Sequence, residues 1–352
     1  MKAIMPLDKT WHEITSTPDI LAYLFDDTSC VGDLAIRIKQ KAITQMLFVG
    51  SGDSYAVAQF IAEHYESQLM ISCEAIQSYE FVHKTPSLFE ESAIFIITAS
   101  GRPSPIIDAL TIASNSNAFV IVVTNHENTQ LLSQADYMLC TGAQKQGVPT
   151  QSTTASLLLL MQLAIYIKAQ HIENDLADLR FTITNSVFND IQEKAFSYHV
   201  DENYPFEEPH IFLSTGNAYF IAEIGCNLLA CGPQLLAHSF LIEEYHHSLR
   251  LLHDNHSRRF ILLLSDKKHE PLFLRTAKTL MTQGANVLLL CAYPLEEKQT
   301  NELTTITFPC CTSVEFNLYS LIFLQILSLK LAEHWVAQGG VRAFSNDNER
   351  KQ

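Results

Sequence analysis

The chain has 352 residues, of which 47% are hydrophobic and 17% are charged, and its formal net charge is −15. This length allows two or three domains, and the apolar content can build a large core, which excludes disordered, collagen-like and coiled-coil chains. Because an acidic chain is repelled by phosphate backbones and by anionic membranes, we expect no nucleic acid and no membrane as partners.

We expect no signal peptide, no membrane span and no disulfide framework in this chain. Residues 1–11 contain no apolar run of the signal-peptide kind, and the apolar stretch at residues 157–167 is shorter than the ~20 residues that span a bilayer. The 8 cysteines include no CxxC pair, which is typical of a reduced protein. We therefore expect a cytoplasmic location.

Strand and helix patterns alternate through the first half of the chain. Each apolar run is continuous, and a helical spacing follows it, which predicts a parallel sheet covered on both faces. The first half predicts strands at residues 46–49, 93–97 and 119–123, and helices at residues 56–65, from residue 105 onward and at residues 156–169.

The same alternation begins again in the second half. Its strand-to-helix turns match those of the first half at a distance of roughly 160 residues, which indicates an internal duplication of one α/β domain. The second half predicts strands at residues 210–213, 260–264 and 286–290, and helices up to residue 224 and at residues 318–336. The expected organisation is a helical leader (1–30), domain 1 (31–195), domain 2 (196–338) and a polar tail (339–352).

Glycine and hydroxyl residues follow two of the predicted strands, at Gly50-Ser51-Gly52 and at Thr98-Ala99-Ser100-Gly101. In doubly wound sheets, ligands bind beyond the carboxyl ends of the strands, where helix N-termini offer free N–H groups. A single such turn is more often a helix cap. Three of them, with residues 147–154 as the third, favour a phosphate site.

Several motifs occur in the order that is typical of one known family. They are Gly-x-Gly-x-Ser-Tyr at residues 50–55, Thr-x-Ser-Gly at 98–101 and Gly-Val-x-Thr at 147–150, with further matches at residues 74–81 and at Glu13-Ile14-x-x-x-Pro18. The chain thereby resembles the sugar-isomerase (SIS) family, above all the isomerase half of glucosamine-6-phosphate synthase and the related deaminases and deglycases. The resemblance implies two tandem SIS domains, each a flavodoxin-like, three-layer αβα unit, related by a pseudo-two-fold axis, in a homodimer.

The resemblance also implies which residues bind a sugar phosphate. The hydroxyl residues of the first two turns should hold the phosphate, and the third segment should face the sugar. Three positions depart from the family pattern: Arg102-Pro103 replaces an acid-Thr pair, Asp53 replaces a common Thr, and Lys145 replaces a common acid. The expected substrate-binding residues are Ser51, Ser54, Thr98, Ser100, Gly101, Arg102, Val148 and Thr150.

The residues that the family uses for catalysis fall in the second half. Glu244 and His247 match the Glu and His of the family's Glu-x-x-His-Gly-Pro motif, with Glu243 beside them. The family's glutamate, sixteen residues before this histidine, falls at Cys231, and its C-terminal lysine falls at Asn346. Both of these family residues are thus absent.

Two interpretations remain open. In one, His247 opens the sugar ring and Glu243 or Glu244 moves the proton through an enediol, as aldose–ketose isomerisation requires. In the other, the chain binds a phosphosugar without turnover, and residues 243–247 are a solvated segment with local ion pairs. We expect a phosphosugar isomerase acting on a hexose or amino-sugar 6-phosphate, with a deaminase or deglycase, or a catalytically degenerate binding protein, as alternatives.

We expect neither a metal nor another cofactor. His253-x-x-His256 with Asp254 has a possible ligand spacing, but the segment reads as a turn before a strand, and the family needs no metal. Gly50 and Gly52 are followed by Tyr55 where a dinucleotide fingerprint has its third glycine.

Overall fold

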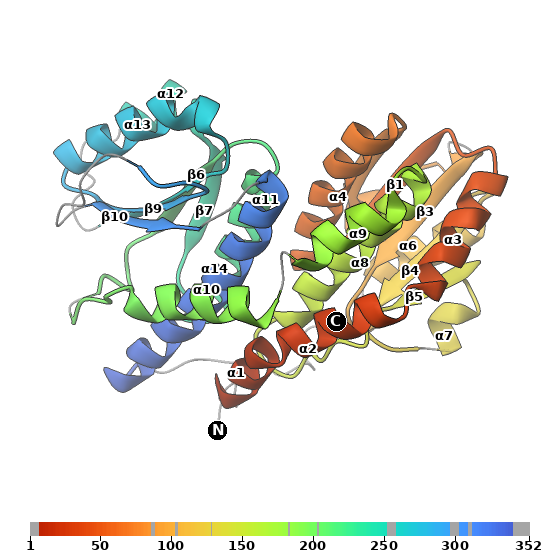
Figure 1. Ribbon diagram of the computed structural model, residues 1–352, viewed down its shortest axis with the longest axis horizontal. Coiled ribbons are helices and arrows are strands. Elements are labelled where there is room, and N and C mark those ends of the chain that lie inside the picture. The colour runs from red at the N-terminus through yellow and green to blue at the C-terminus, as the bar shows by residue number, and fades with distance from the viewer. Residues whose placement is uncertain are drawn as a thin grey trace. The chain divides into compact units, whose positions relative to one another are not determined.

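In the computed structural model, the chain divides into two compact units, which meet in sequence between Asn185 and Ser186. Each unit contains one five-stranded parallel sheet with helices on both faces (Figure 1). The predicted α/β class and its two tandem domains are confirmed. The structure describes residues 7–85, 89–102, 105–127, 129–181, 184–202, 204–251, 258–295, 303–308 and 312–340.

The first unit begins with three helices and continues as alternating strands and helices. The leading helices are α1 (Leu7–Thr15), α2 (Thr17–Asp26) and α3 (Ser29–Gln40). The strands are β1 (Gln45–Gly50), β2 (Ser72–Gln77), β3 (Ser92–Ile97), β4 (Phe119–Thr124) and β5 (Tyr137–Cys140). The remaining helices are α4 (Asp53–Leu69), α5 (Ser78–Phe81), α6 (Pro105–Ser114), α7 (Thr129–Leu132), α8 (Gln151–Lys168) and α9 (Ile172–Phe181).

The strand order in the first sheet is β2-β1-β3-β4-β5, with every neighbouring pair parallel. This is the flavodoxin-like order, in which the direction of winding reverses between β1 and β3. Val49 pairs with Ile96, so the turns that leave these two strands lie at the same edge of the sheet.

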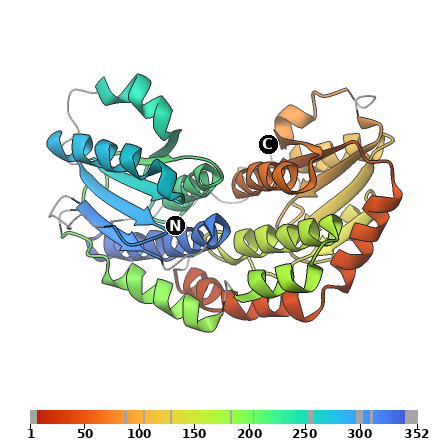
Figure 2. The same ribbon diagram turned by 45° about the horizontal axis from the view of Figure 1, so that its top comes forward.

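Apolar residues on both faces of the first sheet hold its helices. One face packs against α5 and α6 through a cluster that includes Leu47, Ile94 and Leu110. On the other face, the Phe48 ring lies 5.1 Å from the Tyr65 ring of α4, and the Tyr65 hydroxyl donates a hydrogen bond to the Leu160 carbonyl of α8 at 2.7 Å. Figure 2 shows α4 and α8 side by side over this face.

The second unit repeats the pattern of the first. Its sheet has the order β7-β6-β8-β9-β10, which is the same winding as in the first sheet and is what a duplicated domain requires. Its strands are β6 (His210–Ser214), β7 (Ala237–Leu241), β8 (Arg259–Leu264), β9 (Asn286–Cys291) and β10 (Leu303–Thr307). Its helices are α10 (Asn185–Ser197), α11 (Ala218–Cys231), α12 (Ile242–His247), α13 (Glu270–Thr282) and α14 (Ser313–Ala337).

Helices α12 and α13 cover one face of the second sheet, and α11 and α14 cover the other (Figure 1). Gly225 lets α11 approach β6, because a Cβ at this position would lie 2.7 Å from the Phe212 ring. By length and composition α14 could cross a bilayer, but 83% of its most apolar window is buried inside the protein. This helix is therefore a core element of its unit.

Candidate functional site

The turn after β1 stands at the switch point of the first sheet and depends on a glycine. A Cβ at Gly50 would lie 2.4 Å from the Ser54 carbonyl oxygen, so the first turn of α4 could not pack so closely on the strand with any other residue. Gly52 precedes α4 with a φ of 57°, a conformation that glycine adopts without strain. Ser51 is exposed and Ser54 is half-buried at this edge.

The end of β2 adds two polar side chains to this turn. The Ser51 and Ser78 hydroxyl oxygens are 2.5 Å apart, and the Gln77 side-chain amide donates to the Ser51 oxygen at 3.4 Å. The Gln77 side-chain oxygen, Oε1, meanwhile accepts the backbone N–H groups of Tyr79 and Glu80. These contacts fix the orientation of the Gln77 amide and of the Ser51 hydroxyl.

The turn after β3 lies beside the turn after β1. The Thr98 hydroxyl oxygen accepts the Gly101 N–H at 3.2 Å, and Gly101 has a φ of 57°. Ser100 and Arg102 are exposed. The structure thus brings together the expected residues of the first two turns, while Pro103 and Ser104 lie outside the described residues.

The third segment, residues 147–154, follows β5 at the same edge and runs into the first turn of α8. Val148 and Thr150 are buried, and α1 engages both of them. The Val148 N–H donates to the Thr10 hydroxyl oxygen at 2.9 Å, and the Thr150 hydroxyl donates to the Glu13 carboxylate at 3.2 Å. Their expected role of facing a sugar stays a prediction.

Sequence reasoning did not assign Glu13 to the site. Its side chain is buried, and its carboxylate accepts hydrogen bonds from the third segment. Burial raises the pKa of the Glu13 carboxyl, although the Gln146 and Gly147 N–H groups act in the opposite direction. The sequence signal for this residue is the leader motif Glu13-Ile14-x-x-x-Pro18, which contains the glutamate.

In the second unit, α12 follows β7 directly and stands at the carboxyl edge of the second sheet. His247 Nε2 lies 3.3 Å from Glu243 Oε1, one helical turn away, and both side chains are about 70% exposed. Glu244 is also exposed. The structure therefore pairs His247 with Glu243, one of the two carboxylates expected beside it.

His246 is directed to a different neighbour. Its Nε2 lies 2.8 Å from the Thr276 hydroxyl oxygen on α13, and this hydroxyl donates its proton to the Leu272 carbonyl. Because the proton of Thr276 is used in this way, His246 Nε2 must be the donor. Burial, with Arg275 nearby, lowers the pKa of His246. His246 therefore anchors α12 to α13.

Cys231, at the position of the family glutamate, is the last residue of α11 and is exposed. The acid that precedes it on this helix, Glu223, is half-buried, hydrogen-bonded to Tyr219, and has one carboxyl oxygen buried without a partner. Burial raises the pKa of Glu223. Glu223 lies about two helical turns before Cys231 on α11.

The metal hypothesis falls largely on residues that the structure leaves undescribed. His253, Asp254 and His256 lie outside the described residues, as does Asn346. Among the residues that are described, no group of three or more His, Cys, Asp or Glu side chains could hold a metal ion.

A hollow of about 520 Å³ lies at the opposite edge of the second sheet, at the amino ends of β8, β9 and β10. The guanidinium of Arg259, which lines this hollow, is 2.6 Å from the Asp201 carboxylate and lies over the Tyr204 ring. Because Asp201 already balances this charge, the hollow is a weaker candidate for a phosphate than the edge of the first sheet.

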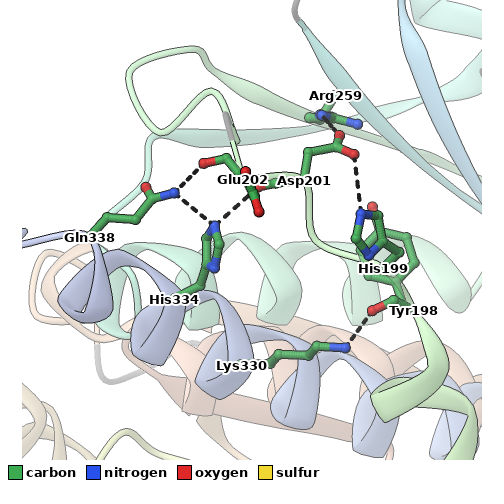
Figure 3. Close-up of polar contacts among 8 residues, drawn as sticks. All are labelled: Tyr198, His199, Asp201, Glu202, Arg259, Lys330, His334 and Gln338. Carbon is green, nitrogen blue, oxygen red and sulfur yellow. Dashed lines mark hydrogen bonds and ion pairs between the residues drawn. The ribbon is translucent and has the colours of Figure 1, made fainter.

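Helix α14 holds the segment that forms one wall of this hollow. Figure 3 shows Lys330, His334 and Gln338 directed toward residues 198–202. The Lys330 ammonium donates to the carbonyls of Ala195 and Phe196, in the last turn of α10, and of Tyr198, just after it. These contacts fix the chain between α10 and β6.

Comparison with known families and proteins agrees with this arrangement. Residues 40–166 match the model of the SIS domain. The chain is 23% identical over 140 residues, 39% of its length, to the HTH-type transcriptional regulator RpiR of Escherichia coli. It is 24% identical over 229 residues, 62% of its length, to the glutamine–fructose-6-phosphate aminotransferase (isomerizing) of Buchnera aphidicola. It spans less than half of each relative, 47% and 37% respectively.

Solved structures resemble the chain over nearly its whole length. The C-terminal domain of glucosamine-fructose-6-phosphate aminotransferase from Francisella tularensis has a TM-score of 0.80 at 18% identity, covering 96% of this chain and 98% of that one. The tagatose-6-phosphate ketose/aldose isomerase of Escherichia coli has a TM-score of 0.75 at 14% identity, covering 99% of both chains. At these identities, the likeness concerns the fold.

Proposed function

Starting from residues 40–166, which belong to the SIS domain family, we propose that this chain is a phosphosugar isomerase that acts on a hexose or amino-sugar 6-phosphate. One observation carries the proposal: two turns rich in glycine and hydroxyls lie side by side at the switch point of the first sheet. The crevice beyond such a point is where doubly wound sheets bind ligands.

The phosphate binds, in this proposal, to the hydroxyls of Ser54, Thr98 and Ser100. The Thr98 oxygen already accepts the Gly101 N–H, so its own proton can be donated to a phosphate oxygen. Arg102 adds a charge-assisted contact, and the N-terminus of α4 adds the favourable end of a helix dipole. A local site of this kind can hold an anion on a chain whose net charge is −15.

The chemistry we assign to α12 is a proton transfer. His247 protonates the ring oxygen as the anomeric hydroxyl loses its proton, which opens the ring. A carboxylate, Glu243 or Glu244, then removes the C2 proton while O1 is protonated, and the enediol forms. Return of the proton to C1, with loss of the O2 proton, gives the ketose. The 3.3 Å contact between His247 and Glu243 supports this pairing of acid and base.

A second candidate is a protein that binds a phosphosugar without turning it over. Cys231 favours it, because a thiol stands where the family has its glutamate. A carboxylate whose pKa is tuned by burial is a common catalytic base, and this position does not provide one. The relative named as a transcriptional regulator is consistent with a binding role.

Exchange of the C2 proton distinguishes the two candidates. Glucose, fructose and glucosamine 6-phosphates are incubated with the protein in D₂O and followed by proton NMR. The isomerase proposal predicts loss of the C2 proton signal of the two aldoses, or of a C1 proton signal of fructose 6-phosphate, and formation of the isomer. Ligand line-broadening without exchange would favour the binding protein, and release of ammonia from the amino sugar would indicate a deaminase.

His247→Ala tests the assignment of the imidazole. We expect it to abolish exchange while leaving line-broadening unchanged, because His247 acts on the sugar ring and not on the phosphate. The matched control is His199→Ala, whose side chain is 84% exposed at the other edge of the second sheet. Equal exchange rates in His247→Ala and the control would remove His247 from the mechanism. The homodimer and the cytoplasmic location expected above belong to this same proposal.

A further inference from the structure

We propose that Glu13, in the N-terminal helix α1, is a positioning residue of the sugar-phosphate site. It fixes residues 144–151, called the 144–151 loop from here on, at the carboxyl edge of the first sheet. The inference rests on the proposed function, because only that function gives this loop a sugar to face. Helix α1 is then part of the binding site and not an appended leader.

The Glu13 carboxylate accepts hydrogen bonds from three donors of the 144–151 loop. One oxygen accepts the backbone N–H groups of Gln146 and Gly147, the latter at 2.7 Å, and the other accepts the Thr150 hydroxyl at 3.2 Å. Glu13 is 1% exposed, so water does not compete for these contacts. A carboxylate that binds successive backbone N–H groups fixes the path of the chain as well as its position.

Further contacts lock the same two segments together. The Val148 N–H donates to the Thr10 hydroxyl oxygen at 2.9 Å, and the Gln151 side-chain amide donates to the Glu13 carbonyl at 3.2 Å. A Cβ at Gly147 would lie 2.1 Å from the Thr10 oxygen, so the loop approaches α1 as closely as glycine permits. The loop conformation is therefore set by α1.

The loop leads from β5 to α8, whose first residue is Gln151. It follows β5 and so lies at the same edge of the sheet as the turns after β1 and β3, because all five strands are parallel. Those two turns are proposed to hold the phosphate, and the loop is proposed to face the sugar. A change at Glu13 should therefore alter binding of the sugar and spare binding of the phosphate.

Removal of the charge should release the loop. In Glu13→Gln, the remaining oxygen is a neutral acceptor for the Gln146 and Gly147 N–H groups, and the new NH₂ group faces the Thr150 hydroxyl. Hydrogen bonds to a neutral acceptor are roughly half as strong as those to a carboxylate, so the loop should open to water more often. The pKa of Glu13 is raised by burial, which shows that the hydrogen bonds act against a cost of desolvation.

The experiment compares Glu13→Gln with wild type in two ways that do not depend on turnover. Hydrogen–deuterium exchange follows the amides of Gln146, Gly147 and Val148 in the absence of ligand. Calorimetric titration then measures binding of inorganic phosphate and of glucose, fructose and glucosamine 6-phosphates. The control is Glu173→Gln, which removes the same charge from an exposed position on α9.

We expect faster exchange at the three amides and a sugar phosphate affinity about tenfold lower, with the affinity for inorganic phosphate unchanged. Unchanged exchange would overturn the role of Glu13, and so would an equal loss of affinity for both types of ligand. If the wild-type protein binds none of these ligands, the proposed function fails. The hydrogen–deuterium exchange data would still test whether Glu13 holds the 144–151 loop against α1.

Thr10 provides a conservative pair that remains informative if Glu13→Gln does not fold. Thr10→Ser keeps the oxygen that accepts the Val148 N–H, and Thr10→Val removes it while keeping the volume. We expect Thr10→Val to lower sugar phosphate affinity and Thr10→Ser to match wild type. Equal losses in the two variants would indicate packing alone and would contradict a positioning role.

Discussion

Acid should destabilise the second unit through one buried histidine. His210, the first residue of β6, is fully buried, and burial lowers its pKa to about 4 from 6.5. Its Nδ1 lies 3.1 Å from the Glu208 carbonyl and must donate to it, so the neutral ring accepts the Tyr204 hydroxyl at Nε2, at 2.6 Å. Protonation would place a second donor against this hydroxyl.

The sign and size of the effect follow from the two pKa values. Because the folded state holds the proton more weakly than the unfolded chain, the stabilisation is complete above pH 6.5 and is lost as the pH falls toward 4. Between pH 7 and pH 5, His210 should remove about 2 kcal/mol from the free energy of unfolding. His64 in the first unit, whose pKa burial also lowers to about 4, should act in the same direction there.

The two tryptophans allow each unit to be followed separately. Trp11 lies in α1, and Trp335 lies in α14, where its ring is 4.8 Å from the Phe206 ring. Urea unfolding of a Trp11→Phe background at pH 7 and pH 5 therefore reports on the second unit. Adding His210→Gln should reduce the loss of stability by about 2 kcal/mol, since the ring no longer titrates.

The control for this experiment is His199→Gln, at an exposed position, which should retain the full loss. If the His210→Gln variant loses as much stability between pH 7 and pH 5 as its background does, the reasoning on burial of the neutral ring is refuted.

Two further substitutions test the local packing. Gly50→Ala forces the first turn of α4 away from β1, and we expect a loss of about 1–3 kcal/mol in the free energy of unfolding together with weaker binding of inorganic phosphate. Gly52→Ala is its control, since a Cβ there meets nothing within 4 Å and adds only backbone strain; equal phosphate affinities in the two variants would contradict the close approach at Gly50. Lys330→Met removes the donor to three carbonyls at the C-terminal end of α10 and should cost about 1–3 kcal/mol in urea unfolding. No change in the unfolding midpoint would contradict this role of the ammonium.

The sequence predicted the inner strands of both sheets and missed the outer ones. The predicted runs correspond to β1, β3 and β4 and to β6, β8 and β9, which are buried on both faces and therefore form continuous apolar segments. The strands β2, β5, β7 and β10 lie at the sheet edges, and most of their residues are only partly buried or exposed. A search for continuous apolar runs cannot detect strands of this kind.

The same limit applies to the site: short segments could be predicted from the sequence, and contacts between residues far apart in the chain could not. The glycine and hydroxyl turns were visible because each is one short segment after a predicted strand. Contacts between Glu13 and Thr150, 137 residues apart, carry no local signal. Glu243 and His247 could be named from the resemblance to the family motif, but the orientation of His246 toward Thr276 required the packing of α12 on α13.

The central claim is that the carboxyl edge of the first sheet binds the phosphate of a sugar. Calorimetric titration with inorganic phosphate and with the three hexose 6-phosphates tests it most directly, in wild type, in Ser100→Ala and in the control Ser114→Ala at the far end of α6. The account predicts that Ser100→Ala weakens binding of every phosphorylated ligand about tenfold, because a hydrogen bond to a charged group is lost, and that Ser114→Ala changes nothing. Binding that is unaffected by Ser100→Ala would contradict the placement of the site.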